Sequence, residues 1–338
     1  MRVNCPAMKP RVTVISLGGT IAMSRDGNGG VTPTLDGEAL VASVPGVAEV
    51  AELTTVSFRR LGSAHLSLED VIALSSEVAR HIDGGAEGIV ITQGTDTLEE
   101  VAFALDLMLA DEVPVVVTGA MRNPTLLGAD GPANLMSAVR VAASPHARGL
   151  GVLVVFNDEV HAARYVQKTH TTSTAAFRSP LTGPLGWLVE GRVRIANRPS
   201  PHPHLDWEAG SELPIVPVAL LKASLGDDGR LIDLVRQAGY GGLVIEAFGV
   251  GHVHVPVAYR LKELAADMPV VLASRTGSGE TLRHTYDFRG SERDLLSSGL
   301  IGAGPLDGPK ARILLSLLLS TGATREQIAG AFAAWSGD

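Results

Sequence analysis

Two α/β domains with mainly parallel sheets are the fold class that three observations on this sequence predict. Short runs rich in β-branched residues recur along the chain without alternation of polar and apolar positions. Amphipathic helical patterns lie between these runs. Together, the two patterns are typical of strands that helices bury on both faces. Third, Pro199, Pro201 and Pro203 fall at every second position, and this spacing predicts an extended linker over residues 197–214.

The larger predicted domain covers residues 1–196. Its apolar runs predict strands at Val12–Leu17, Gly88–Thr92, Val113–Thr118 and Gly151–Asn157. Helices are expected over Ser67–Ile82, over Thr97–Leu109 and after Pro132. The second helix opens with Thr97 and has Glu100 three residues later, which is the spacing of a capping box.

The smaller predicted domain covers residues 215–338, where strands and helices alternate again. Strands are expected at Pro217–Leu221, Gly242–Ala247 and Val270–Ser274. Helices are expected at Leu231–Gln237, Val257–Ala266, Pro309–Ser320 and Thr324–Trp335. The order of these elements again predicts a parallel sheet.

The composition favours a folded, soluble and cytoplasmic protein. Of the 338 residues, 45% are hydrophobic, and the net charge of −8 comes without a basic stripe of the kind that binds nucleic acid. The only cysteine, Cys5, cannot form an internal disulfide. The apolar stretch Ile313–Leu319 is too short to span a membrane, and the N-terminus lacks the apolar core of a signal peptide. We therefore expect neither nucleic-acid nor membrane partners.

Two of the predicted strands end in an unusual way. The first ends in Gly18-Gly19-Thr20, and the second, Gly88–Thr92, ends in Gln93-Gly94-Thr95-Asp96-Thr97. Parallel α/β sheets bind ligands at the carboxyl ends of their strands, where these hydroxyls and the carboxylate would lie. One Gly-Thr pair alone is more typical of a turn and a helix N-cap. Two such pairs at the ends of parallel strands favour a turn and a catalytic site equally.

A series of further segments follows the pattern of one known family. The two strand ends belong to Ile15–Ala22 and Gly94–Glu100. The other segments are, in order, Thr118–Arg122, Ala129–Leu135, Val155–Asp158, Lys168–Thr172, Gly183–Gly186 and Lys310–Arg312. On these segments, which extend over nearly the whole chain, the protein resembles the bacterial-type L-asparaginases of the asparaginase/glutaminase family. The resemblance implies a larger, flavodoxin-like N-terminal domain and a smaller C-terminal one.

The resemblance also implies catalytic residues. Thr20 matches the family's nucleophile. The polar cluster that assists it is matched by Thr95, Asp96 and Lys168. A threonine hydroxyl is a weak nucleophile and needs a proton acceptor. Lys168 can serve only when it is neutral, a state that burial favours and a nearby carboxylate opposes, so the lysine either is the base or acts through Thr95.

Substrate-binding positions follow from the same resemblance. They are Gly19, Ser63, Ala64, Gly94, Thr95, Asp96, Ala120 and His254. Ser63 matches a residue that holds the α-carboxylate, and Asp96 matches the partner of the α-amino group. Ala120 matches a backbone position beside the scissile amide. His254 stands where relatives usually carry an asparagine that reaches into the partner subunit's site.

Three departures from the family pattern concern how tightly the substrate is held. The loop Met23–Thr34 contains no tyrosine, Ala64 stands where a substrate-binding glutamine is common, and Gln93 replaces a usual histidine. Because the predicted nucleophile and its helpers are present, we expect hydrolysis with weakened substrate binding.

The resulting hypothesis is a hydrolase that converts L-asparagine to L-aspartate and ammonia through a threonine nucleophile and an acyl-enzyme, with glutamine as a minor substrate. We expect no cofactor and no metal, since His252 and His254 lack a third ligand. The expected assembly is a homodimer or homotetramer with sites at the subunit interface.

Three alternatives were weighed against this hypothesis. The first is the asparaginase-like subunit of a tRNA-dependent amidotransferase, which carries a longer N-terminal region than the ten residues before Arg11. The second is a non-catalytic two-domain small-molecule-binding protein of the periplasmic kind, which would have no need for Thr20 with Lys168. The third is a dinucleotide-binding dehydrogenase, although Gly18-Gly19 lacks the third glycine of that motif.

Overall fold

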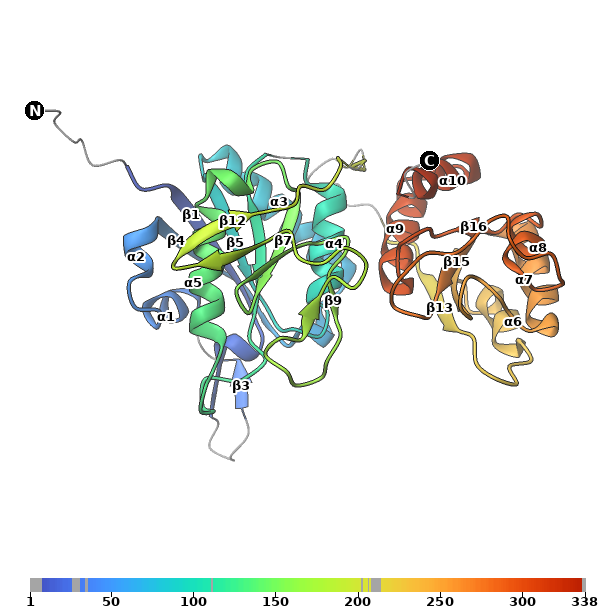
Figure 1. The fold of residues 1–338 in the computed structure, drawn as a ribbon, viewed down its shortest axis with the longest axis horizontal. Coiled ribbons are helices and arrows are strands. Elements are labelled where there is room, and N and C mark those ends of the chain that lie inside the picture. The colour runs from blue at the N-terminus through green and yellow to red at the C-terminus, as the bar shows by residue number, and fades with distance from the viewer. Residues whose placement is uncertain are drawn as a thin grey trace, which may run out of the picture. The chain divides into compact units, whose positions relative to one another are not determined.

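The computed structural model describes residues 8–25, 31–33, 36–110, 112–201, 203–205, 207 and 214–335. Cys5 and residues 26–30 and 34 of the loop without a tyrosine lie outside these ranges. The chain forms two compact units, one of residues 1–201 with 208–210 and the other of residues 202–207 with 211–338. Each unit contains a mainly parallel sheet with helices on both faces, so the predicted fold class of two α/β domains is confirmed (Figure 1).

The first domain is built on an eight-stranded sheet with the order β12-β11-β8-β7-β6-β5-β1-β4. Its parallel strands are β1 (Arg11–Gly18), β4 (Glu52–Leu61), β5 (Gly88–Thr92), β6 (Val115–Thr118) and β7 (Val152–Phe156). Counted in chain order, these strands are arranged 2-1-3-4-5, which is the flavodoxin-like order. The antiparallel strands that extend the sheet are β8 (Glu159–Ala162), β11 (Gly186–Val189) and β12 (Arg192–Ile195).

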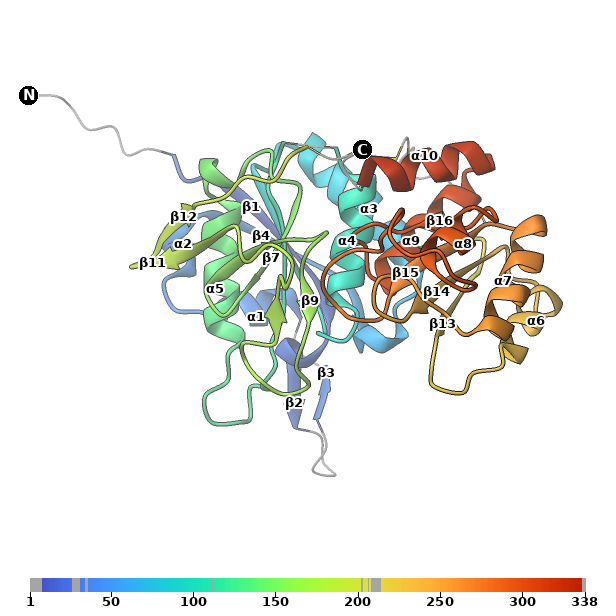
Figure 2. The ribbon, with the colours of Figure 1, turned by 45° about the vertical axis from the view of Figure 1, so that its right-hand side comes forward.

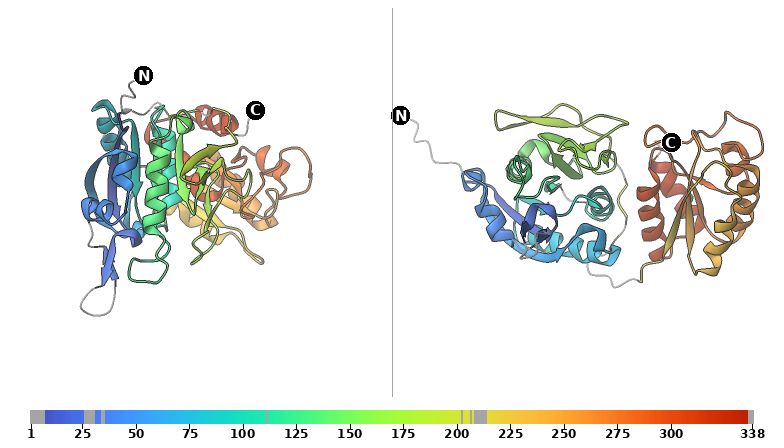
Figure 3. Two further views of the ribbon diagram at one scale, coloured as in Figure 1. Left: turned by 60° about the vertical axis from the view of Figure 1, so that its left-hand side comes forward. Right: turned by 90° about the horizontal axis from the view of Figure 1, so that it is seen from below.

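Helices cover both faces of this sheet (Figures 1 and 3). On one face lie α1 (Gly37–Ala42), α2 (Val47–Val50) and α5 (Gly131–Ala142), whose apolar side chains share one core with β1 and β6. The helices on the other face are α3 (Leu68–Asp83) and α4 (Leu98–Met108), which pack against each other. All five residues of β5 are buried, in agreement with the unalternated apolar run that predicted it.

The starts of α3 and α4 differ from each other. Ser67 caps α3 in a reciprocal capping box with Asp70. The capping box predicted for Thr97 and Glu100 is wrong, because the Thr97 side chain makes no cap hydrogen bond. Its hydroxyl instead donates to the carbonyl oxygen of Ser63, 3.0 Å away. A tertiary contact therefore replaces the local one at the start of α4.

Several short elements surround the main sheet. They are the antiparallel ribbons β2 (Met23–Arg25) with β3 (Val31–Pro33) and β9 (Gln167–Lys168) with β10 (Phe177–Arg178), and the 3₁₀ helices η1 (Thr20–Ala22), η2 (Ser63–His65) and η3 (Pro145–Ala147). None of these was predicted from the sequence. The β9–β10 ribbon is a two-stranded sheet of its own, separate from the eight-stranded one.

The second domain contains a four-stranded parallel sheet with the order β13-β14-β15-β16. Its strands are β13 (Val218–Lys222), β14 (Gly242–Ala247), β15 (Val270–Ser274) and β16 (Ile301–Gly302), and its helices are α6 (Arg230–Gln237), α7 (Val255–Asp267), α8 (Glu292–Leu296), α9 (Gly308–Ser320) and α10 (Arg325–Trp335). Helices α6 and α7 cover one face and α9 covers the other (Figure 3). The strands β14 and β15 have the bounds that the sequence predicted.

Candidate functional site

The sheet order of the first domain places a topological switch point between two neighbouring strands, β1 and β5. After β1 the chain passes to α1 on one face of the sheet, and after β5 it passes to α4 on the other face. In open α/β sheets, ligands bind where adjacent connections diverge in this way, at the carboxyl ends of the strands. The two Gly-Thr segments singled out in the sequence are therefore the two sides of this switch point.

Glycines bring these two strand ends into backbone contact. Gly18 and Gly19 both have positive φ angles, 99° and 80°, which glycine adopts without strain. A Cβ added to Gly19 would lie 2.0 Å from the backbone nitrogen of Gly94. The next residues along the two loops are Thr20, which opens η1 and is half-buried, and Thr95, which is 6% exposed.

The β9–β10 ribbon, whose strand β9 is labelled in Figure 2, contributes a lysine that contacts the second strand end. The ammonium of Lys168 donates to Thr95 Oγ1 at 3.0 Å and forms an ion pair with Asp96 Oδ1 at 2.7 Å. The Lys168 side chain is 17% exposed, whereas that of Asp96 is 67% exposed. The structure thus brings Thr95, Asp96 and Lys168 together, and Asp96 keeps one side open to a ligand.

Ser63 lies behind this cluster and is also buried. Its Oγ accepts the backbone N–H of Asp96 at 3.1 Å. The hydroxyl proton of Ser63 takes no part in that bond and can be donated to an anionic ligand. A Cβ on Gly94 would lie 2.7 Å from Ser63 Oγ, so the serine also approaches this loop closely. Ala64, the next residue, is exposed.

The loop that carries Ala120 is held by two side chains from the start of α5. Asp130 accepts the backbone N–H groups of Met121 at 3.0 Å and Arg122 at 2.8 Å. Asn134 donates to the carbonyl oxygen of Gly119 at 3.0 Å. Sequence reasoning gave neither residue a role, although their spacing of four on one helix could have signalled a shared target. Their bonds fix the backbone on both sides of buried Ala120.

Gln93 is fully buried beneath the second strand end. Its side-chain amide donates to the carbonyl oxygen of Gly94 at 3.3 Å. Its Oε1 has no hydrogen-bond partner within the described residues. The amide therefore supports the Gly94-Thr95 loop from below and is not presented to a ligand.

The two histidines considered as metal ligands lie in the second domain. His252 bridges to Phe248 and places Nε2 3.2 Å from the carboxylate of Glu292, while His254 precedes α7 with Nδ1 3.1 Å from the carbonyl oxygen of Asp227. Burial raises the pKa of Glu292, but hydrogen bonds from backbone N–H groups and from His252 outweigh it and lower the pKa overall. Within the described ranges, no group of three or more potential metal ligands occurs.

A third histidine, His161 on β8, is buried and lies outside the cluster of Thr95, Asp96 and Lys168. His161 is 0% exposed, and its Nδ1 lies 3.0 Å from Ser179 Oγ. The carboxylate of Glu159 lies 3.4 Å from Nε2 but is already paired with Arg178 at 3.2 Å. Burial, and secondly the charge of Arg178, lower the pKa of His161 from 6.5 to about 4.

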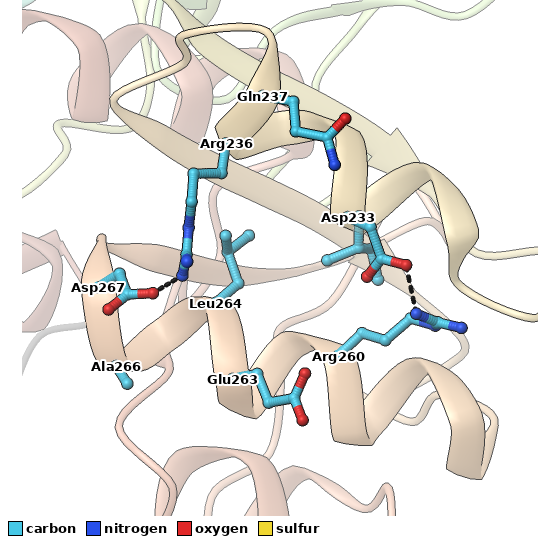
Figure 4. Close-up of a pocket in the computed structure, with 9 residues that line it drawn as sticks. Asp233, Arg236, Gln237, Arg260, Glu263, Leu264, Ala266 and Asp267 are labelled. Atoms are coloured by element: carbon cyan, nitrogen blue, oxygen red, sulfur yellow. Dashed lines mark hydrogen bonds and ion pairs between the residues drawn. The ribbon is translucent and has the colours of Figure 1, made fainter.

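A surface pocket of about 520 Å³ lies between α6 and α7 of the second domain (Figure 4). Its charged walls are formed by two ion pairs that cross between the helices, Arg236 with Asp267 and Arg260 with Asp233. Each arginine thus has a carboxylate partner within the wall. None of the residues that line this pocket carries a hydroxyl group.

Fold and site together define a two-domain α/β enzyme with a hydroxyl, lysine and carboxylate cluster at a switch point. The family model "Asparaginase, N-terminal" matches residues 11–201, and "Glutaminase/Asparaginase C-terminal domain" matches residues 217–332. The chain therefore belongs to the asparaginase/glutaminase family.

Relatives match over nearly their whole length. A probable L-asparaginase of Deinococcus radiodurans is 37% identical, with 97% of this chain and 98% of the relative covered. A "Probable L-asparaginase periplasmic" of Haemophilus influenzae is 35% identical, with coverage of 92% and 89%. The crystal structure of a probable cytoplasmic L-asparaginase from Campylobacter jejuni superposes with a TM-score of 0.87 at 32% identity, covering 96% of this chain and all of the other.

The names of these relatives include both a periplasmic and a cytoplasmic protein. Among the helices that the structure describes, none is long and apolar enough to cross a membrane. The predicted cytoplasmic location stays a prediction.

Proposed function

We propose that this protein hydrolyses L-asparagine to L-aspartate and ammonia, with Thr20 as the nucleophile and an acyl-enzyme intermediate. Glutamine is proposed as a minor substrate. Family membership supports the reaction class. The observation that carries the residue assignment is the contact of Lys168 with Thr95 and Asp96, on a loop whose Gly94 touches the Gly19 that precedes Thr20.

In the proposed first step, Thr20 Oγ1 attacks the side-chain carbonyl carbon of asparagine. The hydroxyl proton of Thr20 is transferred to the departing nitrogen, which leaves as ammonia when the C–N bond breaks. The Thr95 hydroxyl, which accepts a hydrogen bond from the Lys168 ammonium, orients the groups for this transfer. Water then attacks the ester, and its proton returns to Thr20 as aspartate is released. Splitting one difficult hydrolysis into two easier steps is the general advantage of covalent catalysis.

The role of Lys168 follows from its ion pair. An ammonium has no lone pair, and the carboxylate of Asp96 at 2.7 Å stabilises the charged form. We therefore assign Lys168 to orienting Thr95 and to stabilising negative charge, in preference to direct removal of the Thr20 proton in the resting site.

Polar groups around the same switch point are proposed to bind the substrate. Ser63 would donate its free hydroxyl proton to the α-carboxylate. The exposed side of Asp96 would accept the α-amino group. The backbone of Gly19, Gly94 and Ala120 would line the scissile amide, with Ala64 at the rim. His254 would come from a partner subunit in a homodimer or in a tetramer of two such dimers.

Ammonia release from L-asparagine, D-asparagine and L-glutamine, measured side by side, tests the substrate assignment. L-asparagine is expected to give the highest kcat/KM. Thr20→Ala tests the nucleophile and should lower kcat by about 10³-fold or more, as loss of a nucleophile does elsewhere. Thr20→Ser is the matched control, because it keeps a hydroxyl and should retain measurable turnover. A folded Thr20→Ala variant with more than a tenth of the wild-type rate would refute the assignment.

A further inference from the structure

The strand that carries Lys168 has few backbone partners. β9 consists of Gln167 and Lys168 alone, and it pairs with β10 in a ribbon outside the eight-stranded sheet. In that ribbon, Lys168 is opposite Phe177. The hydrogen-bond ladder of the main sheet fixes the strands that lead to Thr20 and Thr95, but it does not fix the backbone of Lys168. Some other contact must set how far its ammonium reaches.

Glu99 provides such a contact. Its carboxylate accepts the backbone N–H of Lys168, a hydrogen bond between residues 69 positions apart in the chain. Glu99 is the second residue of α4, where the positive end of the helix stabilises a carboxylate. Thr95 and Asp96, which precede the N-cap Thr97 of this helix, accept hydrogen bonds from the ammonium of the same lysine. The start of one helix thus holds Lys168 at both its backbone and its side-chain end.

We propose that Glu99 is a positioning residue, which fixes the backbone of Lys168 so that the ammonium meets Thr95 Oγ1 at hydrogen-bond distance. This inference rests on the proposed function, since it assumes that Lys168 acts in turnover. A displacement of about 1 Å in a catalytic group costs on the order of 10²-fold in rate. We expect Glu99→Ala to lower kcat by about 10-fold to 10²-fold. KM should change less than kcat, because the hydrogen bond between Ser63 and the backbone of Asp96 stays in place.

Two variants at the same position separate the hydrogen bond from other effects. Glu99→Gln keeps the length of the side chain and an acceptor oxygen, and it should retain most of the wild-type kcat. Glu99→Asp keeps the charge at the helix start but is one methylene shorter, so it should lose kcat as Glu99→Ala does. If Glu99→Ala fails to fold, Glu99→Asp provides the same comparison.

Glu69 supplies a matched control in the neighbouring helix. It is the second residue of α3, is exposed, and belongs to the same kind of helix start. Glu69→Ala therefore removes a carboxylate from the same position of a helix, its first turn, and leaves the contact between Glu99 and Lys168 in place. Its kcat should equal that of the wild type. A loss equal to that of Glu99→Ala would show that helix stability, and not positioning, is responsible.

A double variant gives the deciding measurement. In a Lys168→Met background, Glu99→Ala should cause no further loss of kcat, because the group it positions is gone. A further loss of 10-fold or more would overturn the inference, as would a wild-type kcat in Glu99→Ala alone. If Lys168→Met itself keeps the wild-type rate, the proposed role of Lys168 fails instead. The two failures are thus distinguishable.

Discussion

Acid should destabilise the first domain through His161, and the size of the effect follows from its burial. The folded-state pKa of about 4 lies below the ordinary value of 6.5, so the unfolded chain binds more protons between these two pH values. Stability therefore rises with pH across this window, is unaffected above it, and is lost progressively as the pH falls from 6.5 towards 4. At about 1.4 kcal/mol per pH unit, the loss reaches about 2 kcal/mol at pH 5 and about 3 kcal/mol at pH 4.

Denaturant unfolding of the wild type and of His161→Gln, at several pH values from 7 to 4, measures this contribution. The variant loses the contact with Ser179 and should be less stable at pH 7. The difference between the two proteins should shrink by about 2 kcal/mol between pH 7 and pH 5, because glutamine does not titrate. Carboxylates that titrate in the same range cancel in this difference.

His146→Gln supplies the matched control for this experiment, because it makes the same substitution at an exposed position, on η3. Parallel pH profiles for the wild type and His161→Gln would refute the reasoning. They would mean that the imidazole is hydrated or protonated in the folded protein despite its place in β8.

Three further predictions concern the proposed active site. Thr95→Val and Lys168→Met should each lower kcat by about 10²-fold or more, and the double variant should be scarcely worse than either; additive losses in steady-state kinetics would mean independent roles. Ala64→Gln should lower the KM for asparagine by about ten-fold, since a hydrogen bond to a charged substrate group contributes roughly 1.5–3 kcal/mol; an unchanged KM would show that other groups already supply this contact. Light scattering should find a dimer or tetramer, and a monomer that stays fully active on dilution would contradict the role proposed for His254.

The parallel core of the fold was predictable because its strands are buried on both faces. Gly88–Thr92 and Val270–Ser274 have the predicted bounds, and in each case a continuous apolar run ends at a glycine or a polar residue. β4 was missed for the opposite reason. It is the edge strand of the sheet, only half-buried, and its polar side chains, including Arg59 and Arg60, hide the pattern.

The candidate site was predictable only where a residue type and a local motif coincide. Gly19 stands out because its positive φ angle and its close approach to Gly94 both require glycine, and Gly94 stands out because Ser63 approaches it closely. Lys168 was found by resemblance, since a single lysine on a two-residue strand has no signature of its own. Glu99 was missed because an acidic residue in a first helical turn already has a local explanation in the helix dipole. Only the folded chain reveals its contact with a residue 69 positions away.

The contact between Gly19 and Gly94 limits how this protein can be re-engineered. Every other amino acid carries a Cβ, which at position 19 would fall 2.0 Å from the main chain of the opposing loop. In a library that varies all positions of both loops, most variants would therefore fail to fold correctly, whatever substrates the reaction itself tolerates. Ala64, by contrast, follows Ser63 in the chain and is exposed. Selection for a new substrate range should begin there, leaving the two glycines untouched.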